Sequence, residues 1–339
     1  MKYITVTTKH HDGFAMFDSK LSDWDIIDRT VYKEDLIKQL ADACQKHDLK
    51  LFLYYSQLDW YQNDYYPRGE TGNKTNRPEQ GNWDNYLKFM NGQLTELLTN
   101  YGEVAGIWFD GWWDKKDADW QLRATYDLIH ELQPQAMIGS NHHQIPFEGE
   151  DFQMFEKDLP GENKGGFSAD AKIGQLPLET AETMANRWGF SLTDKDYKSS
   201  RELIRYLVKA AGYNSNFLLN VGPMPNGKIQ QEFIDTLKIV GNWTQQYGAS
   251  IYKTRGGPIA PQPWGVTIQR EDNIYVHILY WNADGFLLPK IDNQIVGVLD
   301  FQSKEKLKFE VTEYGTLIRL PEERDISTTN YVLEIKIKQ

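Results

Sequence analysis

Strand and helix signals alternate over the first 250 residues or so, and this alternation constrains the fold more than any other feature. Short apolar runs predict six strands, over 3–9, 50–56, 104–110, 136–141, 176–180 and 216–221. Amphipathic periodicity predicts helices between them, over 33–47, 83–101, 119–132, 199–211 and 229–247. Such alternation favours an α/β fold in which a parallel sheet is joined by helical crossovers.

Most polar residues of interest stand at the carboxyl ends of these predicted strands. That edge is the active face of a (β/α)8 barrel and also of an open doubly wound sheet. No GxGxxG or GxxxxGK[ST] motif follows the first strand, which makes a nucleotide-binding sheet the weaker alternative. We therefore predict a (β/α)8-type, TIM-like barrel.

The pattern of apolar residues changes after residue 255. Short alternating runs without helical periodicity follow, over 266–281, 286–291, 296–301, 307–320 and 331–337. These runs predict a small all-β sandwich. The length of 339 residues also suggests two domains. We place the catalytic barrel at 1–255 and the β-sandwich at 256–339.

Composition excludes several classes of function. The net charge of -11 argues against nucleic acid as a partner. No apolar run reaches the roughly 18 residues of a membrane-spanning helix. The single cysteine, Cys44, excludes an internal disulfide and is expected in a helix core. The 11 tryptophans suit stacking on the apolar faces of sugars as well as core packing.

The third predicted strand ends in a carboxylate, Asp110, which Gly111-Trp112-Trp113 follow at once. An aspartate at the end of an apolar strand costs stability unless it is paired or hydrogen-bonded. A carboxylate among aromatic walls at the end of a barrel strand is how sugar-cleaving enzymes present a nucleophile. An aspartate that opens a turn or caps the next helix is the alternative, and this stretch alone supports both equally.

A retaining glycosidase needs a second carboxylate about 5 Å from the first. Apolar neighbours raise the pKa of a carboxyl group, as acid catalysis requires, and Glu156 follows the apolar residues of 152–155. Glu179 follows an apolar run, as Asp110 does. Most of the candidates are expected to be ordinary surface charges: Glu148, Glu150, Asp151, Glu156, Glu162 and Glu179.

Two histidine pairs, His10-His11 and His142-His143, raise the question of a metal. Adjacent strand residues point to opposite sides, so such a pair rarely supplies two ligands to one ion. The sequence contains no HExxH motif and no GxSxG motif, which weakens a metalloenzyme and a serine hydrolase alike. We predict no metal and no cofactor, and hydrogen bonds from these histidines to substrate hydroxyls.

Four motifs occur in a fixed order: TTKHHDGF at 7–14, LYYS at 53–56 with Asp59-Trp60, IWFDG at 107–111, and FLLNVGP at 217–223. Together they resemble the signatures of the α-L-fucosidases of glycoside hydrolase family 29, over residues 2–258. The resemblance implies a barrel followed by a β-sandwich. It also implies a retaining exo-fucosidase that removes terminal α-L-fucose from a glycan by double displacement.

The resemblance also assigns roles to residues. Asp110 matches the nucleophile, and the acid/base matches either Glu156, in an Asp-aromatic-x-x-x-Glu segment, or Glu179. We favour Glu156 because it precedes a long loop. Contacts with fucose or with the nucleophile are implied for His10, His11, Tyr54, Trp60 and Trp108, and His143 stands where some members place an arginine.

Two expectations concern what the sequence lacks. Family members begin with a Gly-x-Phe-x-His-Trp-Gly strand and a further barrel unit, and neither is present here. Six strands would leave an open barrel with two unpaired edges, so we expect an incomplete, N-terminally truncated fucosidase. A fucose-binding protein without turnover and a barrel glycosidase for another sugar are the alternatives. Oligomeric state, compartment and linkage preference stay open.

Overall fold

The computed structural model describes residues 1–75, 77–167, 172–280, 283–321 and 329–338. Contacts divide the chain into two compact units. The first comprises Met1–Met154 with Phe167–Pro177, and the second comprises Phe155–Gly166 with Leu178–Gln339. The domain boundary expected at 255/256 from sequence texture stays a prediction.

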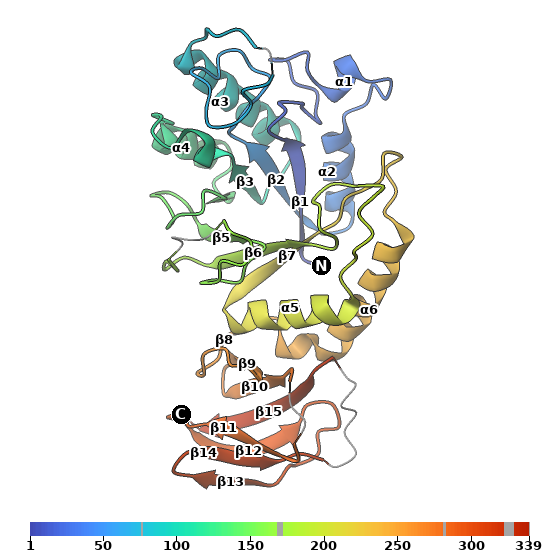
Figure 1. The fold of residues 1–339 in the computed structure, drawn as a ribbon, viewed down its shortest axis with the longest axis vertical. Helices are drawn as coiled ribbons and strands as arrows, with labels where there is room; N and C mark the ends of the chain where they lie inside the picture. Colours follow the sequence, from blue (N-terminus) through green and yellow to red (C-terminus); the bar gives the residue numbers. More distant parts are fainter. Residues whose placement is uncertain (76, 168–171, 281–282, 322–328, 339) are drawn as a thin grey trace. The chain divides into compact units, whose positions relative to one another are not determined.

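One sheet contains seven strands in chain order (Figure 1). The pairs from β1–β2 to β4–β5 and the pair β6–β7 are parallel. The strands are β1 (Tyr3–Lys9), β2 (Lys50–Ser56), β3 (Gly106–Asp110), β4 (Met137–Ser140), β5 (Phe152–Glu156), β6 (Leu178–Thr183) and β7 (Ser215–Asn220). The expected α/β class is therefore confirmed, and the predicted count of six strands was wrong.

The strand missed by the sequence analysis is β5, since none of the six predicted strands covers its residues. Phe152 and Met154 pack closely on β4, because a Cβ on Gly139 would lie within 2.6 Å of both side chains. Gln153 points the other way and donates to loop carbonyls, including that of Lys172 at 2.7 Å. The strand escaped prediction because polar residues at 153 and 156 interrupt a very short apolar run.

The predicted helices are confirmed, with small shifts at their ends. Asp35 and Asn82 cap α2 and α3 with their side chains. Ser199 and Glu202 form a capping box at the start of α5. The helices are α1 (Ile26–Arg29), α2 (Leu36–Lys46), α3 (Trp83–Asn100), α4 (Leu122–Leu132), α5 (Ser200–Gly212) and α6 (Gln231–Tyr247), with the 3-10 turns η1 (Trp112–Lys115) and η2 (Gly248–Ser250). Among the described residues, none of these helices has the length and apolarity to cross a membrane.

In the first unit, α2, α3 and α4 cover one face of the strands and enclose the core. Phe109 of β3 lies 6.0 Å from the ring of Tyr126 on α4. Tyr55 of β2 donates its hydroxyl to Gln93 on α3 at 2.8 Å. Cys44 is buried in this core on α2, as predicted. The residues that alternate with these point away from the helices.

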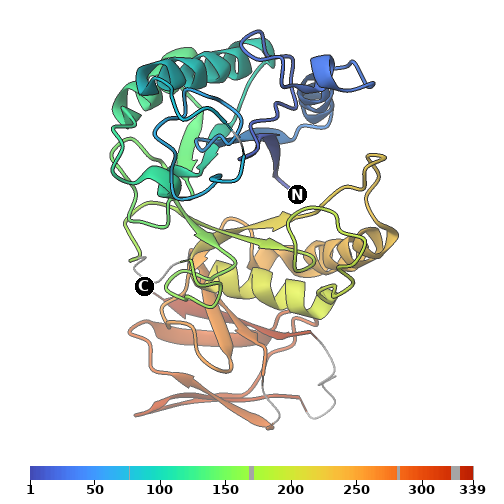
Figure 2. The same cartoon turned by 45° about the horizontal axis from the view of Figure 1, so that its top comes forward.

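In the second unit, α5 and α6 lie side by side (Figures 1 and 2) and share a core with the antiparallel strands. Gly212 of α5 approaches Val266 so closely that a Cβ would lie 2.4 Å from it. A separate apolar cluster includes Phe286 and Ile335. The antiparallel strands form a five-stranded sheet and a three-stranded sheet.

The predicted all-β character of the C-terminal residues is thus confirmed, although residue 281, the last of one expected run, lies outside the described part. The strands are β8 (Arg255–Gly256), β9 (Gly265–Arg270), β10 (Asn273–Ile278), β11 (Gly285–Pro289), β12 (Gln294–Asp300), β13 (Phe309–Thr312), β14 (Gly315–Arg319) and β15 (Tyr331–Lys338).

Candidate active site

Asp110 ends β3, and the alternation along that strand decides where its side chain points. Ile107 and Phe109 are fully buried in the core of the first unit. Trp108 and Asp110 therefore project from the opposite face of the sheet. Because Asp110 keeps only 9% of its surface exposed, its carboxylate needs hydrogen-bond donors.

Three donors hold the carboxylate of Asp110. Oδ1 accepts from the backbone N–H of Gly111 at 2.7 Å and from the indole N–H of Trp113 at 3.0 Å. Oδ2 accepts from the hydroxyl of Tyr54 at 2.8 Å. Gly111 has a φ of 90°, which a residue with a side chain rarely adopts. Oδ1 therefore serves the turn that leads into η1, while Oδ2 bonds to the neighbouring strand.

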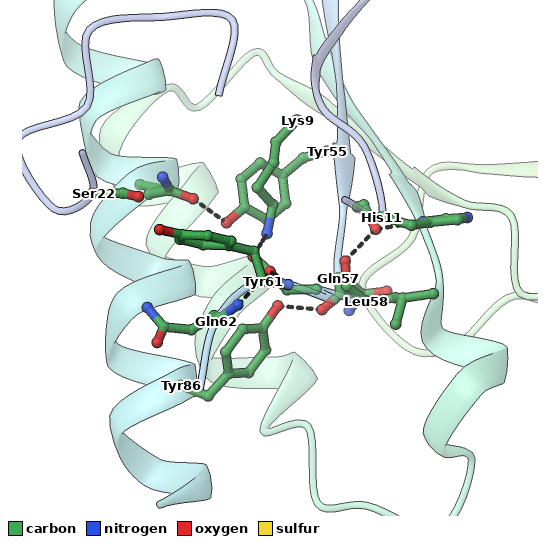
Figure 3. A network of polar contacts seen from close by, with 12 residues as sticks. Lys9, His11, Ser22, Tyr55, Gln57, Leu58, Tyr61, Gln62 and Tyr86 are labelled. Carbon is green, nitrogen blue, oxygen red and sulfur yellow. Dashed lines mark hydrogen bonds and ion pairs between the residues drawn. The ribbon is translucent and has the colours of Figure 1, made fainter. Parts of the chain in front are cut away.

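Ser56 fixes the tautomer of His11 (Figure 3). The Ser56 hydroxyl donates its hydrogen to the carbonyl of Leu58 at 2.5 Å, so it accepts from Nδ1 of His11 at 2.7 Å. In the neutral ring, Nε2 then carries the lone pair, and it lies 3.8 Å from Oδ2 of Asp110. Burial lowers the pKa of His11 to about 4, although the charge of Asp110 opposes this. At neutral pH, His11 presents an acceptor beside Asp110.

His10, Tyr54 and Trp108 form a row of stacked rings. The centroids of His10 and Tyr54 lie 5.5 Å apart, and those of Tyr54 and Trp108 lie 5.3 Å apart. Burial lowers the pKa of His10 as well. Because Tyr54 also bonds to Asp110, this aromatic surface borders the carboxylate and suits the apolar face of a sugar ring.

The residues His10, His11 and Asp110 could together hold a metal ion, because each offers a ligand atom within 4.8 Å of the others. The sequence argument from strand alternation does not apply to them, since β1 ends at Lys9 and the two histidines lie in the following turn. Two histidines and one carboxylate are a chemically suitable donor set for a divalent transition ion. The expectation that no metal takes part stays a prediction.

Trp60 borders His11. Its backbone N–H donates to the carbonyl of His11 at 2.7 Å, and the two rings meet edge to face with centroids 5.6 Å apart. Trp113 meets His11 in the same manner, also at 5.6 Å. The imidazole of His11 thus lies against two indole rings.

The second histidine pair divides between two roles. His142 is 2% exposed, accepts from the backbone N–H of Gln144 through Nδ1 and donates through Nε2 to Glu150 at 3.0 Å. His143 has a φ of 62° and stacks on Phe167 with centroids 5.6 Å apart. Burial lowers the pKa of His143, and the charge of Asp110 acts against that shift.

Four of the six candidate carboxylates form hydrogen bonds or ion pairs with residues other than those that contact Asp110. Glu150 accepts from Tyr126 at 2.9 Å in addition to its contact with His142. Asp151 accepts from the backbone N–H of Ile138 at 2.7 Å. The other two form ion pairs with exposed lysine or arginine side chains: Glu148 and Glu162.

Glu156 and Glu179 lie in the second unit and differ in position. Glu156 is the last residue of β5 and accepts from the indole N–H of Trp188 at 3.1 Å. Glu179 is 5% exposed and is the second residue of β6, so the expectation that it follows the strand was wrong. Thr180 bonds to Tyr206 on α5 at 2.9 Å, so Glu179 faces away from that helix.

Glu182 stands near the carboxyl end of β6 and was not considered from the sequence. It faces the same side of the strand as Thr180. Its carboxylate accepts from the backbone N–H of Thr183 at 2.7 Å and lies 3.3 Å from Nζ of Lys198. These contacts make it a structural ion pair.

Sequence reasoning did not predict the hydrogen bonds that Trp113 and Ser56 make to the site residues Asp110 and His11. Trp113 stands three residues after Asp110, at the start of a 3-10 turn. Side chains at this spacing lie on the same side of such a turn, so the sequence could have placed Trp113 beside Asp110. Ser56 carried no such signal, since its partner His11 is 45 residues away.

Comparison with known proteins gives a consistent result. A family model described as Alpha-L-fucosidase matches residues 1–249. The solved α-L-fucosidase isoenzyme 1 from Paenibacillus thiaminolyticus is 31% identical and superposes with a TM-score of 0.86 over 100% of this chain and 84% of that one.

Two vertebrate proteins are also similar. The tissue α-L-fucosidase of Mus musculus is 27% identical over 84% of this chain and 62% of its own length. The plasma α-L-fucosidase of Homo sapiens is 26% identical over 88% of this chain and 63% of its own length. The chain thus spans less than two thirds of the length of these relatives.

Proposed function

This chain belongs to the α-L-fucosidase family, and from that premise we propose that it removes terminal α-L-fucose from oligosaccharides or glycoconjugates with retention of configuration. The single observation that carries the proposal is Asp110, a buried carboxylate held by three donors beside a row of aromatic rings. The substrate is a fucosylated glycan.

In the proposed mechanism, Oδ2 of Asp110 attacks the anomeric carbon of fucose, and the bond between that carbon and the glycosidic oxygen breaks. The hydrogen bonds from Tyr54 and Trp113 support this role because they hold the carboxylate in one orientation. A second carboxyl group donates a proton to the departing oxygen. The same group then takes a proton from water, which attacks the fucosyl ester on Asp110 and releases fucose.

We assign the acid/base role to Glu156, with Glu179 as the second candidate. Glu156 ends a strand whose residues on the same side, Phe152 and Met154, are apolar, and the indole N–H of Trp188 holds its carboxylate at 3.1 Å. Glu179 is buried and faces away from α5. A retaining enzyme requires either group to lie about 5 Å from the nucleophile.

The other predicted site residues are proposed as sugar contacts. The lone pair at Nε2 of His11 suits a hydroxyl donor, and His10 and His143 supply further imidazoles with lowered pKa values. Trp60 and Trp108 are proposed as apolar walls. We further propose that residues 1–255 form a (β/α)8-type barrel and that 256–339 form a sandwich, which the shared core of two antiparallel sheets supports.

Hydrolysis of an aryl α-L-fucoside by the 339-residue chain tests the proposal. We expect turnover that is lost in Asp110→Asn and kept in Asp117→Asn, a matched change at an exposed aspartate three residues beyond η1's Asp114. A 2-fluoro-fucosyl fluoride should label Asp110, as mass spectrometry would show. Turnover that survives in Asp110→Asn would refute the assignment.

A fucose-binding protein without turnover is the second candidate, because the aromatic row and the histidines form a sugar-binding surface without the acid/base. Fucose binding by calorimetry, together with absent turnover and absent labelling, would favour it. Competition by fucose and not by galactose would separate both readings from a glycosidase for another sugar.

A further inference from the structure

Residues 65–71, in the loop after β2, are hydrogen-bonded to one buried residue of η1, Asp114. Asp114 is 1% exposed. Its Oδ1 accepts from the backbone N–H of Thr71 at 2.7 Å and from the Thr71 hydroxyl at 2.5 Å. Its Oδ2 accepts from the hydroxyl of Tyr65 at 2.8 Å, and its backbone carbonyl accepts from Glu70 N–H at 3.0 Å. Four donors from residues 65–71 thus converge on one residue of η1.

The direction of each hydrogen bond in this connection is fixed. The Thr71 hydroxyl has one hydrogen, and Asp114 as a carboxylate can only accept it. The hydroxyl must therefore accept from the indole N–H of Trp60, which lies 2.9 Å away. Trp60 thus donates to Thr71, and Thr71 donates to Asp114. The reverse direction is excluded, because an indole N–H cannot accept and a carboxylate cannot donate.

Close packing restricts the ring of Trp60 on a second side. A Cβ on Gly72 would lie 2.3 Å from Cδ1 of Trp60, so the loop backbone rests directly against the indole. The φ of Gly72 is 72°, which also disfavours a side chain at this position. The indole is therefore held by a hydrogen bond at its nitrogen and by backbone contact at its edge.

The turn that holds this loop is the same turn that orients the proposed nucleophile. Trp113 of η1 donates to Oδ1 of Asp110, and the next residue is Asp114. His11 lies between the two systems, with Trp113 and Trp60 each 5.6 Å from its ring centroid. A shift of Trp60 would consequently open one side of the His11 pocket while Asp110 keeps its own donors.

We propose that Thr71 and Asp114 are positioning residues that set the ring of Trp60 as a fixed wall of the sugar pocket. This inference rests on the proposed function, since it takes fucose as the ligand beside His11. Neither residue touches the sugar, and both act through Trp60. The expected consequence is on sugar binding rather than on the bond-breaking step, because the donors to Asp110 are unchanged.

Thr71→Val is the informative variant, because valine keeps the shape of threonine and removes the hydroxyl. Thr71→Ser restores the hydroxyl and should rescue the effect. Thr99→Val is the matched control, since Thr99 is exposed on α3 and its hydroxyl bonds within the helix, to the carbonyl of Thr95 at 2.7 Å and the side chain of Asn100 at 3.4 Å. All three variants keep the backbone N–H of Thr71 on Asp114.

The position of Trp60 is read without reference to activity. In protein labelled with 5-fluorotryptophan, the ¹⁹F resonance of Trp60 is assigned by its loss in Trp60→Phe. We expect Thr71→Val to shift or broaden this resonance, and Thr71→Ser and Thr99→Val to leave it in place. An unchanged Trp60 resonance in Thr71→Val overturns the proposal, whatever the enzyme does.

Sugar binding supplies the second readout. We expect Thr71→Val to raise the Kd for fucose and the KM for an aryl α-L-fucoside about fivefold to tenfold, the order of effect of one lost hydrogen bond, with kcat within about twofold. Thr71→Ser should stay within about twofold of the wild type in both.

The outcomes separate this inference from the proposed function. A moved Trp60 resonance with unchanged KM, or an equal loss of kcat, would refute the binding role of Trp60. A wild-type chain that binds no fucose would instead refute the proposed function and, with it, the sugar-pocket role. The fluorine spectra would still decide whether Thr71 positions Trp60.

Discussion

Tyr54 of β2 donates its hydroxyl to Oδ2 of Asp110 of β3 over 2.8 Å. In the parallel register, Tyr54 pairs with Trp108 and Ser56 pairs with Asp110. Tyr54 therefore reaches forward along the inner face of the sheet by one side-chain repeat. The phenol stacks on Trp108 and still bonds to the carboxylate, so one side chain joins the aromatic row to the proposed nucleophile.

Removal of that hydroxyl should reduce catalysis. We expect Tyr54→Phe to lower kcat/KM about tenfold to a hundredfold, because a hydrogen bond to a charged group contributes about 1.5–3 kcal/mol. Steady-state kinetics on an aryl α-L-fucoside measures this. Tyr32→Phe is the control, since that exposed hydroxyl donates to the side chain of Gln39. Equal activity of Tyr54→Phe and wild type would contradict an orienting role.

His11 should make the protein less stable in acid. Its pKa is lowered to about 4 by burial, whereas the unfolded chain takes up this proton near pH 6.5. Between these values the unfolded state binds more protons. The free energy of unfolding therefore falls as the pH drops from about 6.5 to about 4, by up to about 3 kcal/mol from this group.

Urea unfolding at a series of pH values measures the slope. His11→Asn keeps a donor near Ser56 and cannot titrate, so its profile should be flatter than that of the wild type in this window. In ¹H–¹⁵N spectra of the wild type, His11 should show the neutral form protonated at Nδ1 down to about pH 5. A normal pKa for His11, or parallel profiles, would show that its burial does not resist protonation.

Mutation of the buried pair of Lys9 and Asp59 should strongly lower the free energy of unfolding of the first unit (Figure 3). Lys9 is fully buried, lies 2.9 Å from Oδ2 of Asp59 and sits 4.4 Å from the ring centroid of Tyr55. Burial lowers the pKa of Lys9, and Asp59 opposes this. We expect Lys9→Met to cost about 3–5 kcal/mol, because it leaves a buried carboxylate without its cation.

Thermal and urea unfolding would measure that cost. The double variant Lys9→Met/Asp59→Asn should recover more than half of it, since the asparagine oxygen still accepts from the backbone N–H groups of residues 61 and 62. Lys20→Met, which breaks an exposed pair with Asp18, should have no measurable effect. A small loss in Lys9→Met would mean that Asp59 finds water or another donor.

The acid/base assignment yields a direct comparison. We expect Glu156→Gln to lower kcat strongly for a substrate with a poor leaving group and much less for an activated aryl fucoside, which needs no proton. Azide should restore turnover and give a fucosyl azide. Glu179→Gln should show a smaller loss and no rescue. Rescue of Glu179→Gln alone would reverse the assignment, and rescue of neither would exclude both residues.

Much of the fold was readable from local periodicity, and the failures have local causes. The helices α3 and α5 were predicted almost to the residue, because their apolar spacing and their caps lie within one segment. The strand β5 was missed because the polar Gln153 interrupts an apolar run that is only a few residues long. Glu179 was placed at the wrong end of its strand, because the strand continues through Thr183 despite the polar residue at 182.

The candidate site likewise combines features that the sequence predicted with features that it did not. The end of an apolar strand drew attention to Asp110, and the family resemblance implied His11 and Tyr54 beside it; the structure brings all three together. The sequence also drew attention to both histidine pairs, yet only tertiary packing brings His142 to Glu150 and exposes the pKa of His143 to the charge of Asp110. Whether Glu156 or Glu179 joins them stays a prediction.

The sequence by itself determined the strand–helix alternation, the all-β character of the C-terminal residues and the carboxylate that ends β3, because each depends on neighbours within a few residues. Only the tertiary structure decided how these groups are held. Ser56 sets the tautomer of His11 across 45 residues, and Asp114 holds Thr71 across 43. Such pairs arise from strand register and loop packing, which bring together donors and acceptors that no local pattern relates.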